Sequence, residues 1–137
     1  MIKVFIDTDV IIDFLGDRKP FSKHAQEIFM MSYRKQIQLF TSSNSITTGF
    51  YLLCKMANEK KSRELIYGLL KYMSVIPITE KILVQALNSS FKDFEDAVQH
   101  YAAHTETGIK TIVTRNLRDF AKSTLLINSP EEFVFNN

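Results

Sequence analysis

The segment that decides the fold is KVFIDTDVIIDFL, residues 3–15. Its residues 4–6 form a short apolar run, which is typical of a strand buried on both faces of a sheet. Apolar residues then return at helical spacing after residues 7–9, at Val10, Ile11, Phe14 and Leu15. The segment therefore predicts a strand that leads directly into a helix.

Two acidic residues, Asp7 and Asp9, lie at this junction. In parallel α/β folds, binding sites lie outside the carboxyl ends of the strands. Thr8 or Asp9 is a candidate N-cap of the helix, because a side-chain oxygen there can accept a hydrogen bond from a free backbone N–H group. That explanation leaves Asp7 without a structural role, so we treat Asp7 as a candidate site residue.

The composition predicts one globular domain over residues 1–137, with 45% hydrophobic and 23% charged residues. The first residues lack the layout of a secretion signal, and no apolar run is long enough to span a membrane. The single cysteine, Cys54, lies in an apolar context, and we expect a reduced, buried thiol in a cytoplasmic protein. The net charge of +2 means that nucleic-acid binding would need a local basic patch.

Further along the chain, candidate strands alternate with candidate helices. The apolar runs near residues 38–41, 74–78, 111–114 and 124–127 predict four more strands, and Pro77 places the 74–78 strand at a sheet edge or ends it. A helix is expected to start at Pro20, and Ser129 starts a capping-box helix. The alternation predicts an α/β fold: a parallel sheet of about four to five strands with helices on both faces.

Two more groups of polar residues fall where they could meet the first pair. Asp93 and Asp96 lie about 60° apart on one predicted helix and border its apolar stripe. Both could instead be acids of a first helical turn, stabilised by the helix dipole. Asn116 and Asp119 lie in the loop after the 111–114 strand, at the same expected sheet edge.

Carboxylates gathered in one pocket repel one another, and each raises the pKa of its neighbours. A hard divalent cation removes this repulsion, and Mg²⁺ needs only one or two direct carboxylate ligands beside water. Such a site suits metal-assisted hydrolysis of a phosphodiester bond.

Four blocks of the sequence resemble the PIN domain family. They are FIDTDVIIDFL (5–15), SSNSITT (42–48), DFEDAVQHYAA (93–103) and TRNLRDF (114–120). The resemblance implies a metal-dependent ribonuclease with a helix-flanked parallel sheet, often dimeric, and similar to VapC-like toxins that pair with an antitoxin protein.

Matched position by position, the resemblance implies catalytic roles for Asp7, Asp93, Asp96 and Asp119. We expect Asp7, Asp96 and Asp119 to hold Mg²⁺ or Mn²⁺. Supporting polar groups are expected from Asp9, Ser43, Asn44, Thr114 and Asn116. We expect Arg115 and Arg118, which flank the last motif, to contact the phosphate backbone of RNA.

One family position is not matched, because no Asp or Glu occurs between Thr41 and Asn58. The family acid would fall near Gly49 or Phe50, and Ser43 or Asn44 could supply an oxygen through water. The alternative function is therefore a degenerate PIN-like module that binds RNA or protein without catalysis. A haloacid-dehalogenase type of phosphotransferase also carries Asp-x-Asp after a strand, but that class continues with Gly-Thr, whereas Val10-Ile11 follows here.

Overall fold

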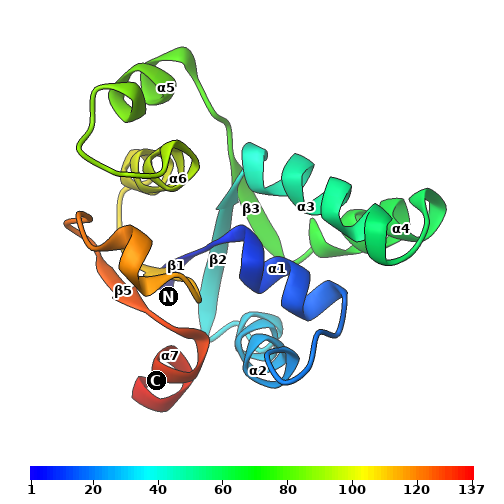
Figure 1. The fold of residues 1–137 in the computed structure, drawn as a ribbon. Helices are drawn as coiled ribbons and strands as arrows, with labels where there is room; N and C mark the ends of the chain where they lie inside the picture. Colours follow the sequence, from blue (N-terminus) through cyan, green and yellow to red (C-terminus); the bar gives the residue numbers. More distant parts are fainter.

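The computed structural model describes all of residues 1–137 and is built around a five-stranded sheet (Figure 1). The strands are β1 (Ile2–Ile6), β2 (Ile37–Ser42), β3 (Met73–Ile76), β4 (Ile109–Val113) and β5 (Leu126–Asn128). Their order across the sheet is β3-β2-β1-β4-β5, and every neighbouring pair is parallel. The predicted α/β class is confirmed, and β1 is the central strand.

Seven α-helices and one short 3-10 helix connect and follow the strands. They are α1 (Thr8–Leu15), α2 (Ser22–Tyr33), α3 (Ser43–Met56), α4 (Glu59–Leu69), α5 (Glu80–Leu87), α6 (Phe94–Thr105), η1 (Leu117–Phe120) and α7 (Pro130–Asn136). The predicted capping box of α7 is confirmed, since Ser129 and Glu132 exchange hydrogen bonds. Pro77 directly follows the edge strand β3, as expected.

Several predicted boundaries were wrong, including the end of β3 at Ile76 and the start of β4 at Ile109, each two residues earlier than expected. Helix α2 begins at Ser22, not at Pro20, because the turn continues through Phe21. Strand β5 begins at Leu126, two residues later than expected. The hydroxyl of Ser123 accepts a hydrogen bond from the N–H of Leu125 at 3.0 Å, and this local turn keeps the preceding residues out of the ladder.

The sheet separates two apolar cores. Val4 and Ile6 point into one core, against helices α1 to α4 and α7, whereas Phe5 points into the other, against α5, α6 and η1. This is the alternation that a strand produces, and it explains why β1 is apolar at three successive positions. Figure 1 shows the two groups of helices on opposite sides of the sheet.

The strand register brings three polar residues to one edge of the sheet. Ile6 pairs with Val113 and Phe5 with Phe40, so Asp7 and Thr114, which follow β1 and β4, lie level with Ser42, the last residue of β2. Helices α1 and α3 begin at this edge. The fold therefore places the predicted junction residues side by side.

Cys54 is free and half-buried, not buried as predicted. The buried stripe of α3 consists of Ser45, Gly49 and Leu53, and Cys54 lies beside this stripe. No helix has both the length and the apolar character needed to cross a membrane.

Candidate active site

The carboxylate of Asp7 lies at the centre of the polar edge. Its Oδ1 accepts hydrogen bonds from the backbone N–H of Thr8 at 2.8 Å and from Gln99 Nε2 at 3.1 Å, and its Oδ2 accepts one from Thr114 Oγ1 at 2.8 Å. The side chain is 5% exposed. Burial raises the pKa of Asp7, the three hydrogen bonds act in the opposite direction, and the charge of Asp93 adds a smaller increase.

Asp7 is also the N-cap residue of α1. The expectation that Thr8 or Asp9 caps this helix was therefore wrong. The strand delivers Asp7 to the start of the helix with extended backbone angles, and its carboxylate accepts the first free N–H group. Thr8 instead donates through its hydroxyl to Ser45 Oγ at 2.9 Å.

Gln99 of α6 connects the three elements that meet at Asp7. Its amide nitrogen donates to Asp7 Oδ1 and to Ser45 Oγ, and its carbonyl oxygen accepts from Ser42 Oγ. Gln99 is fully buried, so each of its polar atoms depends on these partners. The sequence analysis missed this residue, because a glutamine in the middle of a helix gives no signal of its own.

Asp96 is the second buried carboxylate and lies one helical turn before Gln99. It is 6% exposed, and its Oδ2 is buried without a hydrogen-bond partner. Burial and the neighbouring carboxyls of Asp93, Asp7 and Asp119 raise the pKa of Asp96 to about 8. The structure thus brings the four predicted acidic residues within electrostatic range of one another.

The other predicted residues of this group lie at the rim. Asp93, Asn116 and Asp119 are exposed, and Asp93 is the N-cap position of α6 without a capping hydrogen bond. Thr114 is buried, and its hydroxyl both donates to Asp7 and accepts from the N–H of Asn116 at 3.0 Å. The cluster therefore has a buried floor and an exposed acidic rim.

Asp9 connects α1 to the loop after β4. Its Oδ2 accepts a hydrogen bond from the N–H of Arg115 at 3.0 Å, and its Oδ1 is buried without a partner. Burial, followed by the charge of Asp7, raises the pKa of Asp9 to about 7. Asp9 therefore borders the cluster, and its supporting role stays a prediction.

The side chain of Arg115 is held by a buried acid. Its guanidinium donates to both carboxylate oxygens of Asp13, at 2.6 and 3.2 Å, and lies 3.9 Å from the ring centroid of Phe21. Arg18 contacts the same carboxylate at 2.9 Å, and Asp13 is 1% exposed. Arg115 thus has a structural partner in Asp13, and its contact with RNA stays a prediction. The side chain of Arg118 is exposed.

The acidic cluster offers oxygen atoms to a divalent metal but no closed set of direct ligands. No three side chains of His, Cys, Asp or Glu are grouped so that they could ligate one ion, so Asp7, Asp96 and Asp119 do not form a cage of direct ligands. The donors are nonetheless all oxygen atoms, and Asp96 offers a buried, unpartnered one. This set fits a cation such as Mg²⁺ that keeps several of its waters.

Helix α3 contributes amide and hydroxyl groups to this region instead of an acid. A Cβ added at Gly49 would lie 3.4 Å from Ile12 Cδ1, and Phe50 packs against the core formed by α1 to α4 and α7. The two positions where we expected a family acid therefore belong to the packed side of the helix. Ser45 of α3 contacts Gln99 of α6, and Ser43, Asn44 and Thr47 line the space beside α6.

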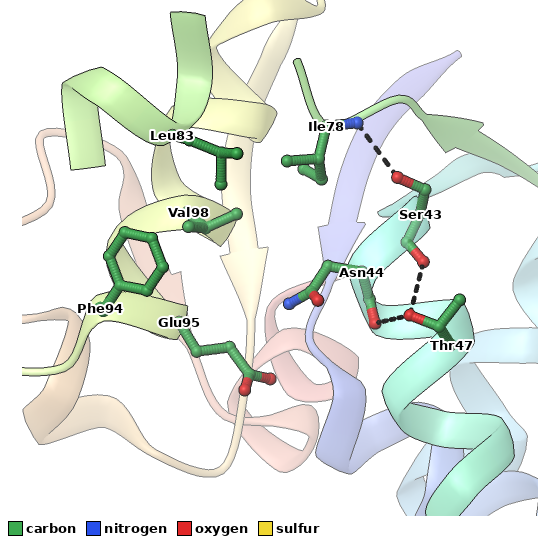
Figure 2. Close-up of a pocket in the computed structure, with 8 residues that line it drawn as sticks. All are labelled: Ser43, Asn44, Thr47, Ile78, Leu83, Phe94, Glu95 and Val98. Carbon is green, nitrogen blue, oxygen red and sulfur yellow. Dashed lines mark hydrogen bonds between the residues drawn. The ribbon is translucent and has the colours of Figure 1, made fainter. Parts of the chain in front are cut away.

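Next to the cluster, α3 and α6 enclose a cleft of about 380 Å³ (Figure 2). Glu95 lines it and was not singled out by the sequence analysis. Burial raises the pKa of Glu95, and the charges of Asp7 and Asp93 raise it further. Glu95 is therefore a further carboxyl within electrostatic range of the acidic cluster.

The sequence was compared with protein families and with proteins of known function, and both comparisons match PIN domain proteins or a ribonuclease. A profile described as "PIN domain" matches residues 3–118. "Ribonuclease VapC1" of Aquifex aeolicus (strain VF5) is 30% identical over 136 residues, which cover 96% of this chain and 92% of that protein.

Solved structures with the same fold include VapBC2 from Rickettsia felis bound to a promoter DNA fragment, with a TM-score of 0.69 and 14% identity over 93% of this chain and 98% of that chain. A toxin-antitoxin complex from Klebsiella pneumoniae matches with a TM-score of 0.66 and 20% identity over 93% and 97% of the two chains. At these identities the two structures establish the fold alone. The profile match and the VapC1 relative together show that the chain belongs to the PIN domain family.

Proposed function

We propose that this PIN domain is a divalent-metal-dependent endoribonuclease that hydrolyses phosphodiester bonds of RNA. The proposed active site is the cluster of Asp7, Asp93, Asp96 and Asp119. The observation that carries the proposal is the buried, unpartnered oxygen of Asp96, which lies among three other carboxyls that raise its pKa. A buried group in this state is a candidate for binding a cation.

Asp7, Asp96 and Asp119 would hold Mg²⁺ or Mn²⁺, directly or through water. When bound, such an ion lowers the pKa of a nucleophilic water and neutralises charge on the phosphate. The hydrogen bonds from Gln99 and Thr114 fix the orientation of the Asp7 carboxylate before RNA arrives. This preorganisation matters because a small displacement of a catalytic group lowers the rate strongly.

The rim residues would complete the site. Asp93 and Asn116, both exposed, would orient water molecules around the phosphate, and Asp9 would hold the loop after β4 in place. Arg118 would contact a neighbouring phosphate of the RNA backbone, and Arg115 would do so in addition to binding Asp13. Ser43 or Asn44 would supply an oxygen through water in place of the α3 acid.

Relatives support a role as the toxin of a toxin–antitoxin pair. One relative is named a ribonuclease, and a protein of the same fold was solved as a toxin-antitoxin complex. We propose that an antitoxin protein binds this chain, and that the chain forms a homodimer and acts in the cytoplasm.

The direct test is cleavage of single-stranded RNA with and without Mg²⁺. Wild type and Glu64→Gln, an exposed acid on α4, should cleave only when the metal is present. Asp96→Asn and Asp7→Asn should reduce cleavage by a factor of about a hundred or more, since each removes a carboxylate from the centre of the site. Cleavage that persists in both folded variants would contradict the proposal.

The second candidate is a non-catalytic module that binds RNA or protein. It is favoured by the absence of an acid on the face of α3 that lies toward α6. Calorimetry with Mn²⁺ separates the two candidates, because a degenerate site should give no binding heat at millimolar metal. A folded wild-type protein that binds RNA but neither binds Mn²⁺ nor cleaves would establish the second function.

A further inference from the structure

We propose that the cleft between α3 and α6 binds one base of a single-stranded RNA substrate and selects guanine. This inference rests on the ribonuclease function proposed above and adds a source of sequence preference to it. The cleft is lined by Ser43, Asn44, Thr47, Ile78, Leu83, Phe94, Glu95 and Val98. Its volume of about 380 Å³ falls within the range of small-molecule sites, roughly 300–1,000 Å³.

The cleft adjoins the acidic cluster, because the first turns of α3 and α6 contribute residues to both. Ser42, the N-cap residue of α3, and Ser45 in its first turn belong to the hydrogen-bond network around Asp7, whereas Asn44 lies between them in sequence and lines the cleft. On α6, Asp96 belongs to the cluster and its neighbour Glu95 lines the cleft. A phosphate at the cluster would therefore place an adjacent base at the cleft.

One side of the cleft offers an apolar surface to a flat ring. Phe94 is 46% exposed, although it is a large aromatic residue in the first turn of α6. Leu83 of α5 is also exposed, and Figure 2 shows it near Phe94 and Val98. Proteins that read single-stranded RNA stack its bases on exposed aromatic rings. Stacking on Phe94 would remove this apolar surface from water.

Two polar side chains at the cleft, one from α3 and one from α6, have no protein partner. Ser43 Oγ already accepts a hydrogen bond from the N–H of Ile78 at 3.0 Å, and the Thr47 hydroxyl donates to the backbone of α3. The side-chain amide of Asn44 and the carboxylate of Glu95 make no hydrogen bond within the chain, and Figure 2 shows them approaching the cleft from opposite helices. They are the groups available to read the edge of a base.

These two groups match guanine better than the other bases. The Watson–Crick edge of guanine has two adjacent donors, N1–H and the N2 amino group, which a carboxylate such as Glu95 accepts together. The next group, O6, is an acceptor that suits the N–H donors of Asn44. Adenine and cytosine place a ring acceptor beside their amino group, and uracil places acceptors on both sides of its single donor, so each would face the carboxylate with a lone pair.

The test measures binding and cleavage on the same RNAs. Labelled oligouridine with one central guanine, inosine or adenine is titrated with the full chain by fluorescence anisotropy without divalent metal, and is then cleaved with Mg²⁺. Inosine lacks only the amino group of guanine, so it isolates one contact of Glu95. Wild type should bind the guanine RNA about tenfold more tightly than the inosine or adenine RNA.

The variants assign the preference to the cleft. Glu95→Gln and Asn44→Ala should lose the preference for guanine over adenine, and Phe94→Ala should weaken binding of all three RNAs about tenfold. The matched controls are Glu64→Gln and Phe135→Ala; Phe135 is 88% exposed on α7. Both controls should bind like wild type.

The outcomes separate this inference from the proposed function. Equal binding of the three RNAs by wild type, no detectable binding, or cleft variants that behave like wild type would overturn the guanine site; Mg²⁺-dependent cleavage would then still support the nuclease. A guanine preference lost in Glu95→Gln, without cleavage by any protein, would support the base site and contradict the nuclease.

Discussion

Gln99 Nε2 donates a hydrogen bond to Asp7 Oδ1 at 3.1 Å and so joins helix α6 to the end of the central strand. The two residues are 92 positions apart in sequence. The same amide group contacts Ser42 and Ser45, so one side chain connects β1, α3 and α6. The position of the Asp7 carboxylate relative to Asp96 depends on this contact, because both Gln99 and Asp96 are carried by α6.

Gln99→Ala is therefore expected to destabilise the protein and to disturb the site. The substitution leaves buried partners on three elements without their hydrogen bonds, at a cost of about 3 kcal/mol in the free energy of unfolding. Urea denaturation measures this, with Gln85→Ala, an exposed position on α5, as the control. A loss below about 0.5 kcal/mol would show that the network contributes little.

The metal-free protein is expected to lose stability as the pH rises. Burial and three neighbouring carboxyls raise the pKa of Asp96 from 3.8 to about 8. The folded chain thus binds more protons than the unfolded chain between these two values, so the free energy of unfolding falls as the pH rises from about 4 to about 8. Urea denaturation in EDTA at several pH values measures this dependence. In Asp96→Asn the free energy of unfolding should change less with pH than in wild type. If the free energy of unfolding falls equally with pH in wild type and in Asp96→Asn, the raised pKa of Asp96 is contradicted.

His100 is expected to have the opposite effect on the acid side. Burial, with a contribution from His104, lowers the pKa of His100 from 6.5 to about 4. Between pH 6.5 and 4, His100 is protonated in the unfolded chain but neutral in the folded chain. The contribution of His100 to the free energy of unfolding is therefore lost as the pH falls from about 6.5 toward 4. Between about pH 6.5 and 4.5 we expect wild type to lose about 2 kcal/mol more than His100→Gln.

Arg115 and Arg118 are expected to differ in what they contribute. Arg115→Ala removes one partner of the buried Asp13 carboxylate and should cost about 2 kcal/mol, less than a fully broken buried pair because Arg18 still contacts Asp13. Arg118→Ala should leave the free energy of unfolding within about 0.5 kcal/mol of wild type but weaken RNA binding. Equal losses of stability in the two variants would contradict this division of roles.

The sequence was sufficient for the sheet and for the strand that carries Asp7. Three successive apolar residues identify β1 as a central strand, and acids after the strand ends point to the carboxyl edge, where the structure places Asp7 and Thr114. The prediction that Thr8 or Asp9 is the N-cap of α1 was wrong, because Asp7 is the N-cap. Thr8, Asp9 and Asp7 are all suitable caps by residue type, and only the backbone angles decide that the helix begins after Asp7.

The contacts around the site could not be predicted, because they join residues far apart in sequence. Arg115 and Asp13 are 102 positions apart, and no local pattern relates them. Glu95 and Asn44 face one cleft only because the starts of α3 and α6, which lie on opposite faces of the sheet, meet at its carboxyl edge. The absence of an acid on α3 was visible in the sequence, whereas its place on the packed side of that helix required the structure.

The central claim is that the carboxylates around Asp7 and Asp96 bind the catalytic cation. The most direct measurement is anomalous diffraction from crystals of the full chain soaked in Mn²⁺. We expect one Mn²⁺ peak at the cluster, bound to Asp96 and Asp7 directly or through water, and no peak there in Asp96→Asn crystals. A wild-type cluster without Mn²⁺ at a concentration that supports RNA cleavage, or a single peak at another site, would contradict the claim.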